Sequence, residues 1–147
     1  VKIGKDSSIW FGAVVRGDVH RIEIGERTSI QDLSMVHVTH YKGNDESTGF
    51  PTIIGSDVTV GHSVTLHGCT IEDGSLIGMS STILDGAVIG KESIVGAGSL
   101  VTPNKKFPPR SMIMGSPAKV VRELTDEEVK GLYEHAGRYV GFKDEYL

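Results

Sequence analysis

The 147 residues include 15 Lys and Arg against 19 Asp and Glu, a formal net charge of −4. This balance argues against a nucleic-acid-binding protein, which needs a basic surface, and no apolar run approaches the ~18 residues of a membrane-spanning helix. The single cysteine, Cys69, excludes an intrachain disulfide and is compatible with a reducing compartment. We therefore expect a cytoplasmic protein with neither a nucleic-acid nor a membrane partner.

Residues 1–103 carry a six-residue repeat. Gly accounts for 19 residues and aromatic residues for only 6% of the chain, which indicates many short strands joined by turns. An aliphatic residue recurs at every sixth position within each run, and these residues are predicted to point inward: Ile3, Ile9, Val15, Ile24, Ile30, Val36, Ile54, Val60, Leu66, Ile71, Ile77, Ile83, Ile89, Val95 and Val101. A period of six is typical of a parallel β-helix. We therefore expect an all-β repeat of about five coils, preceded by an N-terminal coil that this sequence lacks.

The repeat is interrupted at three places, each after the third strand of a coil. The interval between inward residues is nine from Val15 to Ile24, eighteen from Val36 to Ile54, and five from Leu66 to Ile71. All three interruptions are therefore expected over one corner of a triangular prism. The longest insertion, 40–51, is polar and is predicted to be a loop, and loops gathered on one edge of a rigid scaffold often carry function.

The C-terminal part of the chain departs from the repeat. Pro103, Pro108 and Pro109 mark residues 104–124 as an expected connector. Thr125 and Glu128 form a capping box, and apolar residues then follow at helical spacing. Residues 125–147 are therefore predicted to form one amphipathic helix in the same domain.

Three of the six histidines occupy related positions of the repeat. His37 and His67 each directly follow an inward residue, so they are predicted to stack on one outer edge in consecutive coils, where they can bind one metal ion. His62 falls at a different corner. In a three-fold trimer, His62 of one chain can meet the pair of the next chain. His20 and His135 are expected on the surface.

Other polar residues fall in the same two columns. Arg16 lies in the column of the first two histidines, whereas Asp32 lies in the column of His62, with Gln31 beside it. A trimer interface would bring the two columns together, with Arg16 of one chain near Asp32 of the next. The tripeptide that contains Arg16 and Asp18 is expected to form an ion pair or an anion anchor at this interface.

Four segments carry a resemblance to a known family: 16–18 (RGD), 29–32 (SIQD), 36–37 (VH) and 60–69 (VGHSVTLHGC). With these segments, the chain resembles the gamma-class carbonic anhydrases over its whole length. The resemblance implies a left-handed parallel β-helix with a C-terminal α-helix, assembled as a homotrimer. It also implies zinc, with iron or cobalt as alternatives, bound by His37, His62 and His67 across the subunit interface. The implied activity is the reversible hydration of carbon dioxide to bicarbonate by metal-bound hydroxide.

Four residues are candidates for catalytic roles. Arg16 can anchor the anion and Gln31 can orient the metal-bound water, while the resemblance implies that Tyr139 approaches the metal. His40, at the start of the corner loop, is predicted to relay protons. Strongly active members of the family carry a glutamate after the RGD segment, where this chain has Val19. We therefore expect modest activity that rises with external buffer.

Three classes of function remain open at this point. The first is a metal-dependent carbonic anhydrase, which is a lyase. The second is a metal-binding or assembly protein of the same family with little hydratase activity. The third and least favoured is a hexapeptide acyltransferase, which shares the G-x-P-A element at Gly115 but gives no reason for two stacked histidines.

Overall fold

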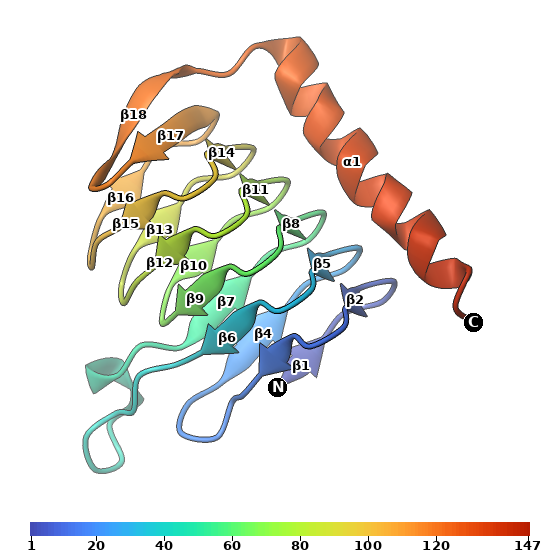
Figure 1. Ribbon diagram of the computed structural model, residues 1–147. Coiled ribbons are helices and arrows are strands. Elements are labelled where there is room, and N and C mark those ends of the chain that lie inside the picture. Colours follow the sequence, from blue (N-terminus) through green and yellow to red (C-terminus); the bar gives the residue numbers. More distant parts are fainter.

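The computed structural model describes residues 1–147 and shows a solenoid of short strands with one helix running along its side (Figure 1). The strands form three sheets. The first contains β1 (Lys2–Ile3), β4 (Ile22–Ile24), β7 (Thr52–Ile54), β10 (Thr70–Ile71), β13 (Val88–Ile89) and β16 (Lys106–Phe107). The second contains β2 (Ser8–Ile9), β5 (Ser29–Ile30), β8 (Thr59–Val60), β11 (Leu76–Ile77), β14 (Ile94–Val95), β17 (Ser111–Gly115) and β18 (Ala118–Glu123). The third contains β3 (Val14–Val15), β6 (Met35–His37), β9 (Thr65–His67), β12 (Thr82–Ile83) and β15 (Leu100–Val101).

The six-residue repeat produces this arrangement. From β1 to β14, each strand pairs in parallel with the third strand after it, so inward residues of successive coils stack directly, as Ile54 does on Ile71 and Ile71 on Ile89. The inward residues from Ile24 to Val101 are all buried. The parallel β-helix is confirmed.

The first turn of the solenoid differs from the prediction. Ile3 and Ile9 were expected inside, but they are 48% and 37% exposed, and Val15 is half-buried. Each of their strands lies at the end of its sheet, with a neighbour on one side only. One side of each of these side chains is therefore left without a neighbouring coil to pack against.

The segment 104–124, expected as a connector, instead forms three strands. Phe107 and Ile113 continue the six-residue phase from Val101, and β16 and β17 extend the first and second sheets in parallel register. The prolines lie outside these strands and leave the pairing intact. The chain then turns back, and β18 pairs antiparallel with β17 across a register shift between Met112 and Ile113. The solenoid therefore has about six turns rather than five.

The three interruptions lie over one corner, as predicted. They fill the connections from β3 to β4, from β6 to β7, and from β9 to β10, all of which join the third sheet to the first. The longest contains the short 3-10 helix η1 (Glu46–Thr48) and is closed at its base by a bridge between Thr39 and Phe50. In Figure 1 this loop projects from the lower left of the prism.

The C-terminal helix α1 (Asp126–Asp144) begins at the predicted residue. The Thr125 hydroxyl accepts a hydrogen bond from the Glu128 N–H, and the Glu128 carboxylate accepts one from the Thr125 N–H. Leu132 and Ala136 are buried, and the helix contacts β2, β5 and β8 of the second sheet. No helix of the structure combines the length and apolar character needed to cross a membrane.

Candidate metal and catalytic site

His37 and His67 lie side by side on the interrupted corner. β6 and β9 pair in a register that aligns the two residues, and their ring centroids are 5.2 Å apart. Nδ1 of His37 and Nε2 of His67 are 3.3 Å apart. The predicted stacking of these histidines is confirmed.

A carboxylate binds the other nitrogen of each ring. Nε2 of His37 is 2.9 Å from Asp18 Oδ1, and Nδ1 of His67 is 2.9 Å from Asp85 Oδ1. When each ring donates its N–H to its carboxylate, the two facing nitrogens both carry lone pairs, which repel each other unless a cation lies between them. Two ligands at ~2.0–2.1 Å from one tetrahedral zinc ion are themselves about 3.3–3.4 Å apart. The residues present therefore fit a metal ion.

Asp18 also contacts the guanidinium of Arg16, which is exposed at the end of the same column. The hydrogen bond from His37, reinforced by that from Arg16, lowers the pKa of Asp18 to about 2. The carboxylate is therefore ionised at neutral pH and orients His37. Within one chain Arg16 pairs with Asp18, and its predicted approach to Asp32 of a neighbour stays a prediction.

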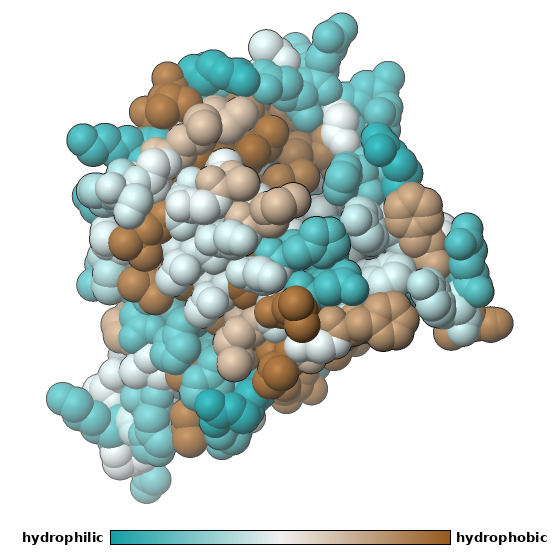
Figure 2. Space-filling model, in the orientation of Figure 1, coloured by the Kyte–Doolittle hydropathy of each residue, from teal (hydrophilic) through white to brown (hydrophobic).

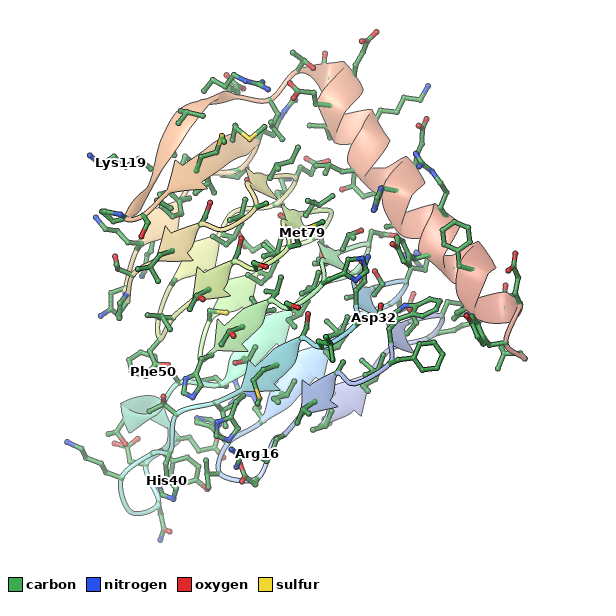
Figure 3. The ribbon with its side chains drawn as sticks, in the orientation of Figure 1. Arg16, Asp32, His40, Phe50, Met79 and Lys119 are labelled. Carbon is green, nitrogen blue, oxygen red and sulfur yellow. The ribbon has the colours of Figure 1, made fainter.

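His62 and Asp32 form the second predicted column. The Ser63 N–H donates to the Asp32 carbonyl, and His62 Nδ1 is 3.4 Å from Asp32 Oδ1. Arg16 and Asp32 lie at different corners of the prism (Figure 3). No group of three metal-ligating side chains forms within one chain. The third ligand and the trimer stay predictions.

A groove of about 280 Å³ lies beside His62, between the second sheet and α1. Gln31, His135 and Tyr139 also line it. Gln31 is buried, and its amide Nε2 donates to Ser29 Oγ at 3.4 Å. His135, expected on the surface, is half-buried because α1 turns it toward this groove, and burial, reinforced by the charge of Arg138, lowers its pKa. The structure thus brings Gln31 and Tyr139 to the His62 corner.

His40 lies apart from both columns. Its exposed ring stacks on Tyr41, with centroids 5.2 Å apart, and it makes no hydrogen bond to the histidine pair. It lines a polar hollow of about 390 Å³ that also includes Asp18. Figure 3 shows His40 on the corner loop, beyond Arg16. A proton leaving the pair would have to cross this hollow to reach His40.

His20, predicted as a surface residue, is buried. Its Nδ1 accepts a hydrogen bond from the Arg21 N–H at 2.8 Å, and its Nε2 is 3.2 Å from the Glu46 carbonyl. The long corner loop folds back over His20 and covers it. His20 therefore holds that loop against the solenoid.

Asp85 is a site residue that the repeat pattern did not reveal. It follows His67 by eighteen residues, whereas the paired strands β9 and β12 are offset by seventeen, as from Leu66 to Ile83. The repeat register therefore places Asp85 one residue beyond the position that aligns with His67, and the turn after β12 brings its carboxylate back to the imidazole. Each of the three histidines is paired with an aspartate: His37 with Asp18, His62 with Asp32, and His67 with Asp85.

Comparison with known proteins places the chain in a family. The model "Bacterial transferase hexapeptide (six repeats)" matches residues 68–103. Gamma carbonic anhydrase 2 from Arabidopsis thaliana mitochondria is 49% identical over 140 residues, which are 95% of this chain and 50% of that protein. A carbonic anhydrase from Geobacillus kaustophilus is 47% identical over 140 residues, 95% of this chain and 72% of the relative. The chain belongs to the gamma-class carbonic anhydrase family. It spans half the length of the Arabidopsis relative.

A further relative and two solved structures are also similar to this chain. Protein YrdA from Escherichia coli is 53% identical over 147 residues, 100% of this chain and 79% of that protein. A hexapeptide transferase family protein from Anaplasma phagocytophilum superposes with a TM-score of 0.88 and 42% identity, covering 99% of this chain and 81% of the other. A hexapeptide-repeat acetyltransferase from Vibrio cholerae, solved with acetyl coenzyme A, gives a TM-score of 0.68 and 25% identity over 85% and 72% of the two chains. The hexapeptide solenoid thus hosts more than one activity, and function has to be argued from the site.

Proposed function

We propose that this chain is a metal-dependent carbonic anhydrase that interconverts carbon dioxide and bicarbonate. The observation that carries the proposal is the pair His37 and His67, whose facing nitrogens lie 3.3 Å apart while a carboxylate binds the other nitrogen of each ring. Paired imidazoles with this second layer of carboxylates are the usual surroundings of a catalytic metal. An acyltransferase would need a catalytic histidine but gives no reason for two facing ones.

His37 and His67 of one chain, with His62 of a neighbour, would hold the metal, for which we propose zinc. When bound there, the metal would lower the pKa of water to about 7, and this value comes from carbonic anhydrase itself. Asp18 fixes the imidazole tautomer of His37 and keeps its chelating nitrogen free of a proton.

The remaining residues act on substrate, water and proton. Gln31, buried in the groove beside His62, presents an amide that orients the reacting water. Tyr139 closes the side of that groove and restricts the position of the water. Arg16 provides an exposed positive charge for bicarbonate, and His40 accepts protons across the polar hollow.

We further propose that three chains assemble into a homotrimer with one site at each interface. In one chain the histidines lie at two corners, and a three-fold arrangement lets His62 of one subunit face the pair of the next. The first turns expose the apolar side chains of Phe11, Val14, Leu33 and Met35. Figure 2 shows apolar residues gathered on the lower part of this face, where burial in an interface would stabilise the assembly.

The activity is tested by stopped-flow hydration of carbon dioxide with zinc-, cobalt- and iron-loaded protein. We expect hydration with at least one metal and no transfer of acetyl groups from acetyl coenzyme A. Stoichiometric metal binding without hydration for all three metals would replace the proposal with the metal-binding or assembly function. Acetyl transfer in the absence of hydration would favour the acyltransferase.

The shared site is tested by mixing two inactive variants. His62→Ala and His37→Ala each damage every interface of a uniform trimer. In mixed trimers, a His37→Ala chain can lend its His62 to the intact pair of a His62→Ala chain. We expect unfolding and refolding of the two variants together to restore part of the zinc binding. No restoration, or light scattering that shows a metal-loaded monomer, would contradict the interfacial site.

A further inference from the structure

Asp85 belongs to the turn that follows β12, one coil beyond His67. Its Oδ1 accepts from His67 Nδ1 at 2.9 Å, and its Oδ2 accepts from the Thr39 hydroxyl at 2.6 Å. The carboxylate therefore joins three segments: the strand that ends in His67, the next coil, and the base of the long corner loop.

We propose that Asp85 is a positioning residue for His67 and that the third sheet and corner loop are shaped to hold its carboxylate in place. This inference rests on the proposed function, because it concerns the histidine that would bind the metal. A neutral imidazole carries its proton on either nitrogen, according to the partner of each. Asp85 keeps that proton on Nδ1, so that the Nε2 lone pair faces His37.

The residue after His67 supports this role independently. Gly68 has φ +66°, and a Cβ added there would lie 2.4 Å from Asp85 Oδ1 and 2.8 Å from Phe50 Cβ. A side chain at this position would compete with the carboxylate for the same space. Glycine at 68 therefore leaves room for Asp85 to reach His67, in addition to permitting the turn.

The corner loop completes the arrangement. Thr39 and Phe50 pair across the base of the loop and face Asp85 and Gly68 respectively. The Thr39 hydroxyl occupies one carboxylate oxygen and directs the other toward His67. The loop thus contributes to the orientation of His67 although it supplies no histidine to the pair.

Zinc affinity, measured by competition with a chromophoric chelator, tests the inference without any measurement of activity. We expect Asp85→Ala to weaken zinc binding roughly 10- to 100-fold, as loss of such a partner does at other metal sites. Asp85→Asn should weaken it less, because its amide oxygen still accepts from Nδ1. Asp73→Ala is the matched control: Asp73 is also a turn carboxylate, and its Oδ1 accepts from the Ser56 N–H at 2.8 Å, far from the histidines.

A pair of glycine variants separates positioning from general strain. Gly68→Ala and Gly98→Ala both place a methyl group on a residue with positive φ, +66° and +70°, but a Cβ at Gly98 meets nothing within 4 Å. Both should lose stability, and only Gly68→Ala should also lose zinc affinity. Equal zinc affinity in the two folded variants would contradict the competition between residue 68 and Asp85.

The tautomer of His67 provides a further test. If Asp85 only stabilised the fold, its replacement would not change that tautomer. Nitrogen NMR shifts of the metal-free protein, at a pH where imidazole is neutral, should show His67 protonated on Nδ1 in the wild type and mixed in Asp85→Ala. If the wild type binds zinc but Asp85→Ala keeps both its affinity and its tautomer, the inference is wrong and the proposed function stands. If the wild type binds no metal, the proposed function fails and the inference fails with it.

Discussion

The same six-residue repeat builds two regions that differ. It is unbroken in the upper turns of the solenoid, and it is interrupted at one corner of the lower turns. From Ile71 to Val101 every sixth residue is fully buried, and one tight turn follows another. At the corner between the third and first sheets, the first three connections deviate from the period. Asp18 lies in the first of them, and His37 and His67 end the strands that lead into the second and third. Regular stacking supplies stability, and local departures from it release polar side chains for chemistry.

The difference follows from how each region satisfies its backbone. In the unbroken turns, strand pairing satisfies the strand backbone, and buried serine hydroxyls such as those of Ser75 and Ser81 donate to backbone carbonyls of the next coil. At the corner, loop segments need other partners, and they find them in side chains such as His20 and Thr52, whose hydroxyl donates to the His37 carbonyl. Side chains therefore satisfy backbone groups in both regions, by small serines in the unbroken turns and by larger residues at the corner.

The largest expected effect lies in the unbroken stack. Ile77→Ala removes a fully buried side chain between Val60 and Val95, and it should lower the free energy of unfolding by about 2–5 kcal/mol. Urea denaturation measures this change. Glu72→Ala, on an exposed position of the same region, should change stability by less than about 0.5 kcal/mol. Similar losses in both variants would show that stacking is not the source of stability.

The next effect concerns the groove beside His62. Gln31→Ala should lower the rate of carbon dioxide hydration at least about tenfold, because the buried amide no longer orients the reacting water. Stopped-flow kinetics with zinc-loaded protein measures the rate, and chelator competition should show unchanged zinc affinity. A parallel loss of zinc would mean that Gln31 supports His62 rather than the water.

A smaller effect is expected in the corner loop. His40→Ala should lower hydration by roughly twofold to tenfold at low buffer concentration, because one route for protons is lost. High concentrations of imidazole buffer should restore the rate in the variant. A wild-type rate that is high and independent of buffer would rule out His40 as the relay.

The smallest effect concerns acid stability at the corner. The pKa of Asp18 is lowered to about 2 in the folded chain, against ~3.9 for an unperturbed aspartate. Its ionised form therefore stabilises the fold above pH ~4, and this contribution is lost as the pH falls toward 2. The stability difference between wild type and Asp18→Asn, from urea denaturation of metal-free protein, should shrink over that range. A difference that stays constant down to pH ~2 would mean that Asp18 acts through packing alone.

Much of this architecture could be predicted from the sequence, because a six-residue period constrains both direction and register. It placed the inward residues from Ile24 to Val101, the stacking of His37 on His67 and that of Asp32 on His62. The capping box at Thr125 placed the start of α1. These features depend on short-range spacing, which the chain itself displays.

Other features depend on neighbours that spacing does not identify. Phe107 and Ile113 keep the phase, but the surrounding prolines made 104–124 resemble an irregular segment. The burial of His20 depends on how the long loop folds back, and the pairing of Asp85 with His67 depends on the direction of a turn. The exposure of Ile3 follows from its place at the end of a sheet, which the repeat alone does not reveal.

The antiparallel return of β18 bears on how the solenoid avoids polymerisation. A stack of parallel strands that ended at β17 would offer a free edge, on which another chain could add coils and grow a fibre. β18 covers that edge in the opposite direction, with a register shift between Met112 and Ile113. It presents exposed Lys119 (Figure 3), and Arg122 is exposed as well. Charged residues and irregular pairing on an edge strand discourage further strand addition. β18 therefore acts as a terminator for the second of the three sheets.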